Sequence, residues 1–141
     1  MNETDSYRKV VHAIMWFGDK IMLAQILKPG YHKGYWTDPG GKVNDGELIQ
    51  NALTREVYEE TGVFFPNIDY ELIDCFVYSE RKIKSFLYVI KPGLHRFWEI
   101  KNTEPKKQSK WQLFTLEEAL KLKLLPSVRN YLEELTYVEK N

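Results

Sequence analysis

Residues 41–63 constrain the fold of this chain more than any other stretch. The glycine pair Gly40-Gly41 is followed by turn-forming residues at 44–46, and no Pro or Gly then occurs before Gly62. This order predicts a glycine loop, a helix from about Leu48 to Glu60, and a glycine cap at the helix end. Apolar residues recur at helical spacing, so one face of the helix should pack against a core. They are Ile49, Ala52, Leu53 and Val57.

The acidic residues of this helix fall on the face that should be apolar. Advancing 100° per residue from Ile49 puts Glu56 near about −20° and Glu60 near about +20°, with Glu59 near about −80°. Carboxylates are almost never buried unless they are paired or bind a metal. The pattern therefore favours oxygen ligands for a hard cation such as Mg²⁺, with a solvated acidic helix as the alternative. Arg55 precedes Glu59 by four residues and can pair with it.

Length and composition indicate one domain that spans residues 1–141. The formal net charge is zero, so the chain lacks the basic excess of a general nucleic-acid binder, and we expect no nucleic-acid partner. The polar N-terminus is not a signal peptide, and no apolar run is long enough to cross a bilayer. We therefore expect a cytoplasmic protein without a membrane partner. The single cysteine, Cys75, lies in an apolar run and is expected in the core.

Segments typical of strands and helices surround the acidic helix. Gly18-Asp19 separates two apolar runs and predicts a hairpin. Thr115 and Glu118 form a capping-box pattern at the start of a later helix. The predicted strands cover residues 10–17, 20–27, 70–79, 84–90 and 111–114, and the later helices cover 116–123 and 127–134. This order predicts an α/β fold with helices on both faces of a mixed sheet.

The acidic stretch resembles the Nudix box of the Nudix hydrolase family, in particular its MutT-like nucleotide pyrophosphohydrolases. Seven identities at fixed spacing carry the resemblance, together with aliphatic residues at the two expected positions. The matching residues are Gly41, Glu47, Arg55, Glu56, Glu59, Glu60 and Gly62, with Val57 and Val63 as the aliphatic positions. The resemblance implies a Nudix-type α/β/α sandwich. It also implies hydrolysis of the pyrophosphate linkage in nucleoside diphosphate derivatives.

The family's site residues can be transferred to this chain position by position. The resemblance implies Mg²⁺, with Mn²⁺ as an alternative, held by the Gly40 carbonyl, Glu56 and Glu60. Glu59 is a third ligand or holds a metal-bound water. Glu56 is the first candidate for the general base, and Glu104 is the second because a similar Glu-Pro precedes a Trp in some nucleotide-sanitising relatives. Arg55 is expected to orient the carboxylates, with Glu47 as its partner.

Segments on both sides of the box are expected to hold a small-molecule nucleotide. Gly41 and Lys42 belong to the phosphate end of the predicted site. Cations and aromatic side chains alternate in the loop before the glycine pair, which suits phosphates and a base; the alternative is that Trp36 simply covers the core. The predicted contacts in this loop are Lys33, Tyr35 and Trp36, and those on the opposite wall are Trp111 and Leu125. Two such walls would form a narrow slot, so we expect (deoxy)nucleoside triphosphates to be cleaved to monophosphate and pyrophosphate.

Three alternatives remain open at this point. Tyr78 lies near the place where dinucleoside polyphosphate hydrolases carry a Tyr. ADP-ribose hydrolases usually carry a Pro in the region of residues 78–80, and this chain has none there. A catalytically inactive Nudix module that binds nucleotide or protein is the third, and the complete carboxylate set argues against it. The sequence is compatible with a monomer or a homodimer.

Overall fold

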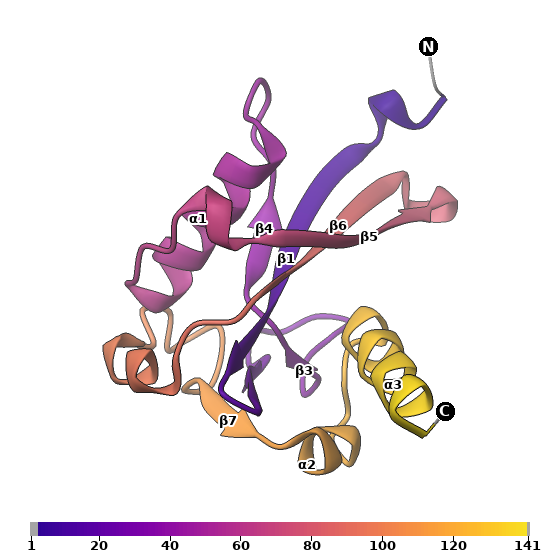
Figure 1. Ribbon diagram of the computed structural model, residues 1–141. Helices are drawn as coiled ribbons and strands as arrows, with labels where there is room; N and C mark the ends of the chain where they lie inside the picture. The colour runs from indigo at the N-terminus through magenta and orange to yellow at the C-terminus, as the bar shows by residue number, and fades with distance from the viewer. Residues whose placement is uncertain (1–2, 141) are drawn as a thin grey trace.

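The computed structural model describes residues 3–140, and within them a mixed sheet of seven strands forms the centre of the molecule (Figure 1). The strand order is β3-β2-β1-β6-β5, and β4 and β7 pair with β1 and β2 off this path. The strands are β1 (Arg8–Phe17), β2 (Lys20–Gln25), β3 (Trp36–Thr37), β4 (Gly40–Lys42), β5 (Glu71–Tyr78), β6 (Ile83–Ile90) and β7 (Gln112–Phe114). The helices are α1 (Ile49–Thr61), α2 (Leu116–Leu120) and α3 (Pro126–Lys140), with short 3₁₀ segments at Glu3–Ser6, Asn67–Asp69, Ser79–Arg81 and Leu94–Glu99.

Strand β1 connects the other strands to one another. It pairs antiparallel with β2 and β4 and parallel with β6. The predicted hairpin at Gly18-Asp19 is confirmed, and Gly18 takes the positive φ of 67° that its turn requires. The chain between β1 and its parallel neighbour β6 contains α1, as a crossover between parallel strands usually does.

Helices cover both faces of the sheet, so the predicted α/β sandwich is confirmed. Helix α1 packs on one face through Ala52, Leu53 and Val57, which are fully buried. Helices α2 and α3 pack on the other face, through residues such as Ala119 and Leu132. Figure 1 shows α1 and α3 on opposite sides of the sheet. The predicted capping box at Thr115 and Glu118 is present at the start of α2.

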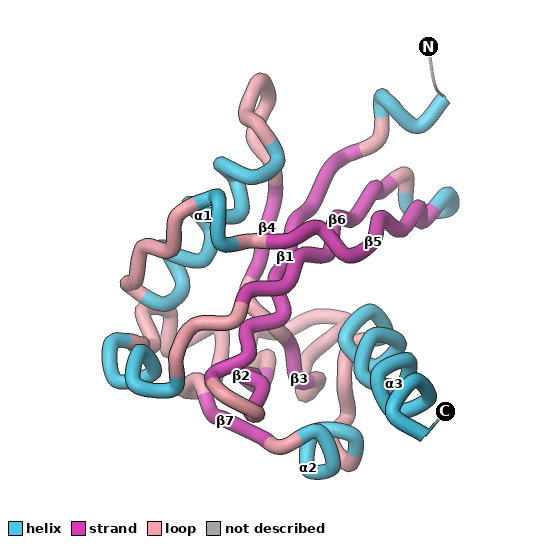
Figure 2. Tube along the Cα trace, in the orientation of Figure 1, coloured by secondary structure: helices cyan, strands magenta, loops and turns pink. Residues whose placement is uncertain are grey.

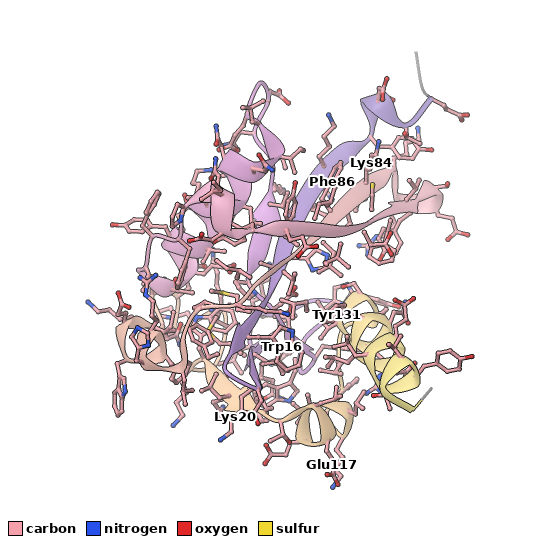
Figure 3. All side chains as sticks on the ribbon, viewed as in Figure 1. Trp16, Lys20, Lys84, Phe86, Glu117 and Tyr131 are labelled. Carbon is pink, nitrogen blue, oxygen red and sulfur yellow. The ribbon has the colours of Figure 1, made fainter. Side chains whose placement is uncertain are left out.

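A hydrogen bond ties α3 to the sheet. The indole Nε1 of Trp16 in β1 donates to the hydroxyl of Tyr131 in α3 at 3.2 Å, and Figure 3 shows the two residues facing each other. At the outer end of β6, the Lys84 ammonium lies 5.7 Å from the centre of the Phe86 ring. The first of these contacts holds α3 on the sheet, whereas the second lies within β6.

The expectation that Cys75 lies in the core is wrong. Strand β5 is the last strand of the sheet order and pairs only with β6 among the described residues, so most of its side chains are exposed, including Cys75. An apolar run does not distinguish an edge strand from a central one, and only the sheet order does. Among residues 3–140, no helix is both long and apolar enough to cross a membrane.

Candidate active site

Gly40 and Gly41 allow three elements to meet at one point. In β4, Gly40 pairs with His12 and Gly41 with Val11 of β1. A Cβ atom at Gly40 would lie 2.2 Å from the carbonyl oxygen of Val11. A Cβ atom at Gly41 would lie 2.3 Å from the carboxylate of Glu56 in α1. Only glycine at both positions lets β1, β4 and the acidic face of α1 approach this closely.

Glu60 is half-buried against the glycine loop, as its inward-facing helix position predicted. The backbone N–H of Gly40 donates to Glu60 Oε2 at 3.0 Å. Burial raises the pKa of Glu60 to about 9, although the hydrogen bond from Gly40 opposes the shift. The charges of three neighbouring carboxylates raise this pKa as well: Glu56, Glu104 and Asp38. Like charges are therefore crowded at this end of α1.

Arg55 organises the carboxylates on the outer side of the cluster. Its Nε donates to Glu47 at 2.9 Å, and its Nη1 donates to Glu56 Oε1 at 2.9 Å and to Glu59 at 3.3 Å. Its Nη2 donates to the Lys42 carbonyl at 2.8 Å. The predicted pairings of Arg55 with Glu59 and Glu47 are confirmed, and the contact with Glu56 adds to them. Arg55 thus joins α1 to the glycine loop and orients three carboxylates.

Glu56 lies between this arginine and the acidic cluster. Burial raises the pKa of its carboxyl group, Arg55 lowers it through a hydrogen bond and its charge, and Glu59 and Glu104 raise it again. The net shift is upward from the ordinary value. A carboxyl group with a raised pKa is suited to accept a proton near neutral pH.

The chemistry of these side chains fits a divalent cation, but their orientation does not yet form a complete site. Within the described part of the chain, no group of three or more His, Cys, Asp or Glu side chains is arranged to hold a metal ion. Arg55 engages Glu56 and Glu59, and Gly40 engages Glu60. The donors are all oxygens, and neighbouring carboxylates raise the pKa of Glu56 and of Glu60, so a hard cation would relieve their repulsion. In the present arrangement, Glu56 and Glu60 direct carboxylate oxygens toward Arg55 and Gly40.

A cleft of about 810 Å³ opens beside this cluster. Of the predicted site residues, Gly40, Gly41, Lys42, Leu125 and the carboxylates line it. Its other walls come from β1, the loop after β2, the loop before β7 and the outer ends of β5 and β6. Figure 2 shows the segment between β2 and β3 as a loop. The lining carboxylates are Glu56, Glu59, Glu60 and Glu104.

The aromatic walls that the sequence predicted are not those of the cleft. Trp36 packs edge-to-face on Phe114 at 5.3 Å between ring centres, within the core beneath α2 and α3. Trp111 is buried, and its Nε1 donates to the Glu60 carbonyl at 3.1 Å. The Lys123 ammonium lies over Tyr35, 4.4 Å from the centre of the tyrosine ring. These three aromatics do not line the cleft, and the packing alternative describes Trp36.

Lys33 is also outside the cleft, with an exposed side chain. Its loop neighbours Tyr31 and His32 line the cleft instead, with their rings edge-to-face at 4.8 Å. The predicted loop therefore contributes to the cleft, but through residues other than Lys33, Tyr35 and Trp36. The direction of each side chain depends on how the loop folds back, with Gly34 N–H bonded to the Ile26 carbonyl at 2.8 Å.

His12 and Asp38 form a buried pair on the floor of the cleft that sequence reasoning missed. Nδ1 of His12 lies 2.7 Å from Asp38 Oδ2, and the two side chains are 12% and 2% exposed. Burial lowers the pKa of His12, but the charge of Asp38 and its hydrogen bond outweigh burial, and the net shift is upward. Nothing in the sequence indicated Asp38 as the partner of His12, because the two residues are 26 positions apart.

Curated relatives of this chain include nucleotide hydrolases. An 8-oxo-dGTP diphosphatase of Buchnera aphidicola subsp. Acyrthosiphon pisum is 36% identical over 75 residues, which are 53% of this chain and 60% of that protein. The uncharacterized Nudix hydrolase YvcI of Bacillus subtilis is 29% identical over 108 residues, 77% of this chain and 51% of that protein. The chain thus spans between about half and three fifths of the length of these relatives.

Solved structures and a family model agree on the fold. The crystal structure of a MutT NUDIX hydrolase from Burkholderia pseudomallei superposes with a TM-score of 0.75 over 89% of this chain and 95% of that one, at 23% identity. The described strands and helices therefore have the arrangement of a Nudix fold. The family model described as the NUDIX domain matches residues 6–135, which is most of the chain. By fold, box and family match together, the chain belongs to the Nudix hydrolase family.

Proposed function

We propose that this chain hydrolyses the pyrophosphate linkage of (deoxy)nucleoside triphosphates and releases a monophosphate and pyrophosphate. The observation that carries the proposal is the convergence of Glu56, Glu60 and Glu104 with the glycine loop on one cleft. Relatives that include an 8-oxo-dGTP diphosphatase support the same substrate class. A site that binds phosphates needs charge neutralisation and exact positioning more than covalent chemistry.

A divalent cation, Mg²⁺ or Mn²⁺, completes this proposal. Glu56, Glu60 and the Gly40 carbonyl would hold it, with Glu59 as a further ligand or as the partner of a bound water. When bound, such an ion neutralises phosphate charge and makes a water molecule a better nucleophile. The crowded carboxylates and the raised pKa of Glu60 support this assignment, because both are the properties of a site that gains from added positive charge.

The chain's own residues divide the remaining work. In the proposed reaction a water oxygen attacks one phosphorus, the bond from that phosphorus to the bridging oxygen breaks, and Glu56 accepts the proton of the water. Glu104 is the second candidate for this base. Arg55 acts through Glu56 and Glu59, which it orients, and is therefore a positioning residue. Lys42 and Gly41 line the cleft and are the proposed contacts of the phosphates.

The cleft supports a mononucleotide, with dinucleoside polyphosphates as the second candidate. Leu125, which the sequence predicted, lines the cleft, and Tyr31 joins it as a proposed contact of the base in place of Trp36 and Trp111. Tyr78 also lines the cleft, which is the observation that favours the second candidate. Among the described residues of the cleft, none gives comparable support to ADP-ribose as the substrate.

A substrate panel tests the proposal. Deoxynucleoside and ribonucleoside triphosphates, ADP-ribose and dinucleoside polyphosphates are incubated with the protein and Mg²⁺, and the products are separated by chromatography. We expect the triphosphates to give the highest kcat/KM, with monophosphate and pyrophosphate as products and no turnover in excess chelator. A kcat/KM higher for dinucleoside polyphosphates than for triphosphates would show that the dinucleoside polyphosphates are the preferred substrates. Nucleotide binding without turnover of any substrate would indicate an inactive module.

A further inference from the structure

One polar side chain of the cleft, that of Gln108, has no role in the proposed chemistry. Gln108 lines the cleft from the loop before β7 and is only 7% exposed. Its side-chain Nε2 is buried and has no hydrogen-bond partner among the described residues. A buried donor without a partner costs free energy, and such groups in native proteins usually have a function.

The backbone around Gln108 is held firmly. Its N–H donates to the Glu104 carbonyl at 3.2 Å, and its carbonyl accepts from Asn102 Nδ2 at 3.1 Å. An isolated antiparallel bridge joins Gln108 to Ile26, and the next residue, Ser109, donates its N–H to the Gln25 carbonyl at 2.8 Å. The loop is thereby attached to the sheet edge, and the backbone from which the unpaired amide extends is held in one position.

A second unpaired nitrogen lines the same cleft. Nδ1 of His32 is buried without a hydrogen-bond partner in the described part of the chain. Burial lowers the pKa of His32, and the charges of Arg81 and Lys28 lower it further, so the imidazole is neutral at pH 7. His32 follows β2 and Gln108 precedes β7, and both segments are joined to the sheet through Gln25 and Ile26.

These groups fit the edge of a nucleobase better than a phosphate. Neutral amide and imidazole groups provide hydrogen bonds without charge, and the apolar side chains of Ile26 and Leu125 line the same cleft. A flat heteroaromatic ring needs this combination of an apolar contact and a few fixed polar groups. The nearby ammonium of Lys107 is paired with Glu104 at 3.1 Å.

We propose that Gln108 determines the base specificity of the site by donating a hydrogen bond from Nε2 to a keto oxygen of the nucleobase. The proposal deepens the proposed function and rests on it for the identity of the substrate. A guanine, uracil or thymine base presents a keto oxygen where adenine or cytosine presents an amino group. A fixed donor therefore favours the keto bases.

The test replaces the side-chain amide of Gln108, a hydrogen-bond donor, by a carboxylate of the same shape, which only accepts. Gln108→Glu and Gln108→Leu are compared with the wild type on dGTP against dATP and on dTTP against dCTP. We expect the wild type to favour the keto base in each pair. Gln108→Glu should lower the keto-to-amino ratio of kcat/KM by roughly tenfold, mainly through KM, because a donor is lost and an acceptor is gained. Gln108→Leu should lower kcat/KM for keto bases without improving it for amino bases.

Controls separate this role from a structural one. Gln50→Glu makes the same chemical change at an exposed position of α1 outside the cleft and should leave the base ratio unchanged. A purely structural Gln108 would lower kcat/KM equally for all four bases, together with the unfolding temperature, and that result would overturn the proposal. Absence of base preference in the wild type would overturn it as well.

A binding experiment keeps the inference separate from the proposed reaction. Calorimetric titration with dGMP and dAMP measures base preference without hydrolysis. If no triphosphate is hydrolysed but dGMP binds more tightly and Gln108→Glu reverses the order, the proposed function fails and the role of Gln108 stands. If the triphosphates are hydrolysed but the variant leaves the ratio unchanged in both assays, the role of Gln108 fails and the proposed function stands.

Discussion

At the scale of single residues, the acidic side chains of α1 are of one residue type but differ in their surroundings. Glu59 is exposed and paired with Arg55, whereas Glu60 is half-buried beside Gly40 and other carboxylates. Glu56 lies between these environments, bonded to Arg55 yet partly desolvated. Three glutamates within five positions therefore have different surroundings, which suit them to different roles.

Glu56→Gln should lower kcat by about a hundredfold or more, as loss of a general base or of a metal ligand does. The measurement is steady-state hydrolysis of the best triphosphate with saturating Mg²⁺. Glu117→Gln, at an exposed position of α2 outside the cleft, is the matched control and should retain wild-type turnover. A wild-type kcat with only an altered KM would show that Glu56 is not the general base. Glu104 would then be the next residue to test.

Glu60→Gln should leave the metal-free protein at least as stable as the wild type above neutral pH. The folded-state pKa of Glu60 is raised from 4.5 to about 9, so the folded state holds this proton more tightly than the unfolded chain. Its contribution to stability is fully present below the unfolded pKa and is lost as pH rises through the folded pKa. The wild type's unfolding temperature in chelator should therefore fall between about pH 5 and pH 9, and the variant's should fall less. Identical pH profiles for both proteins would contradict this prediction.

At the scale of elements, the site depends on a contact between the glycine loop and α1. The loop is a strand of the sheet, β4, and not a free turn, so its position is fixed by pairing with β1. The two glycines have different neighbours, since Gly40 faces the backbone of β1 and Gly41 faces the end of a flexible side chain. Their substitutions should consequently have different effects.

Gly41→Ala should impair catalysis while changing stability little, because its new methyl group displaces the Glu56 carboxylate, which can turn aside. Gly40→Ala should destabilise the fold by about 1–3 kcal/mol, because its methyl group meets the backbone of Val11, which cannot move away easily. Thermal unfolding and kcat measured on both variants check the pair. Equal loss of stability in the two variants would show that the Glu56 side chain cannot turn aside as expected.

At the scale of the whole molecule, the cleft is assembled from segments far apart in the chain. The glycine loop, α1, the loop after β2, the loop before β7 and the start of α3 all contribute residues to its lining. Helices α1 and α3 pack on opposite faces of the sheet, yet the cleft includes residues from α1 and from the first turn of α3. A ligand that bridges these segments should therefore stabilise the entire fold.

Mg²⁺ should raise the unfolding temperature of the wild type, because the proposed cation site exists in the folded carboxylate cluster and not in the unfolded chain. Such linkage is worth about 2.7 kcal/mol when the free ion is about 100 times its dissociation constant. Calorimetry with increasing Mg²⁺ measures the effect, and Glu60→Gln should reduce it. An unfolding temperature that does not change with Mg²⁺ would contradict the proposed cation site.

The local structure of this protein could be predicted from its sequence. The helix, its glycine cap, the hairpin and the inward positions of Glu56 and Glu60 follow from periodicity and turn chemistry, which act between residues close in the chain. Tertiary structure alone decided the pairing of His12 with Asp38 and the burial of Trp36 and Trp111 away from the cleft. It also exposed Cys75 on an edge strand and brought Gln108 into the cleft. These outcomes depend on which strands become neighbours and which loops fold back over them, and no local pattern contains that information.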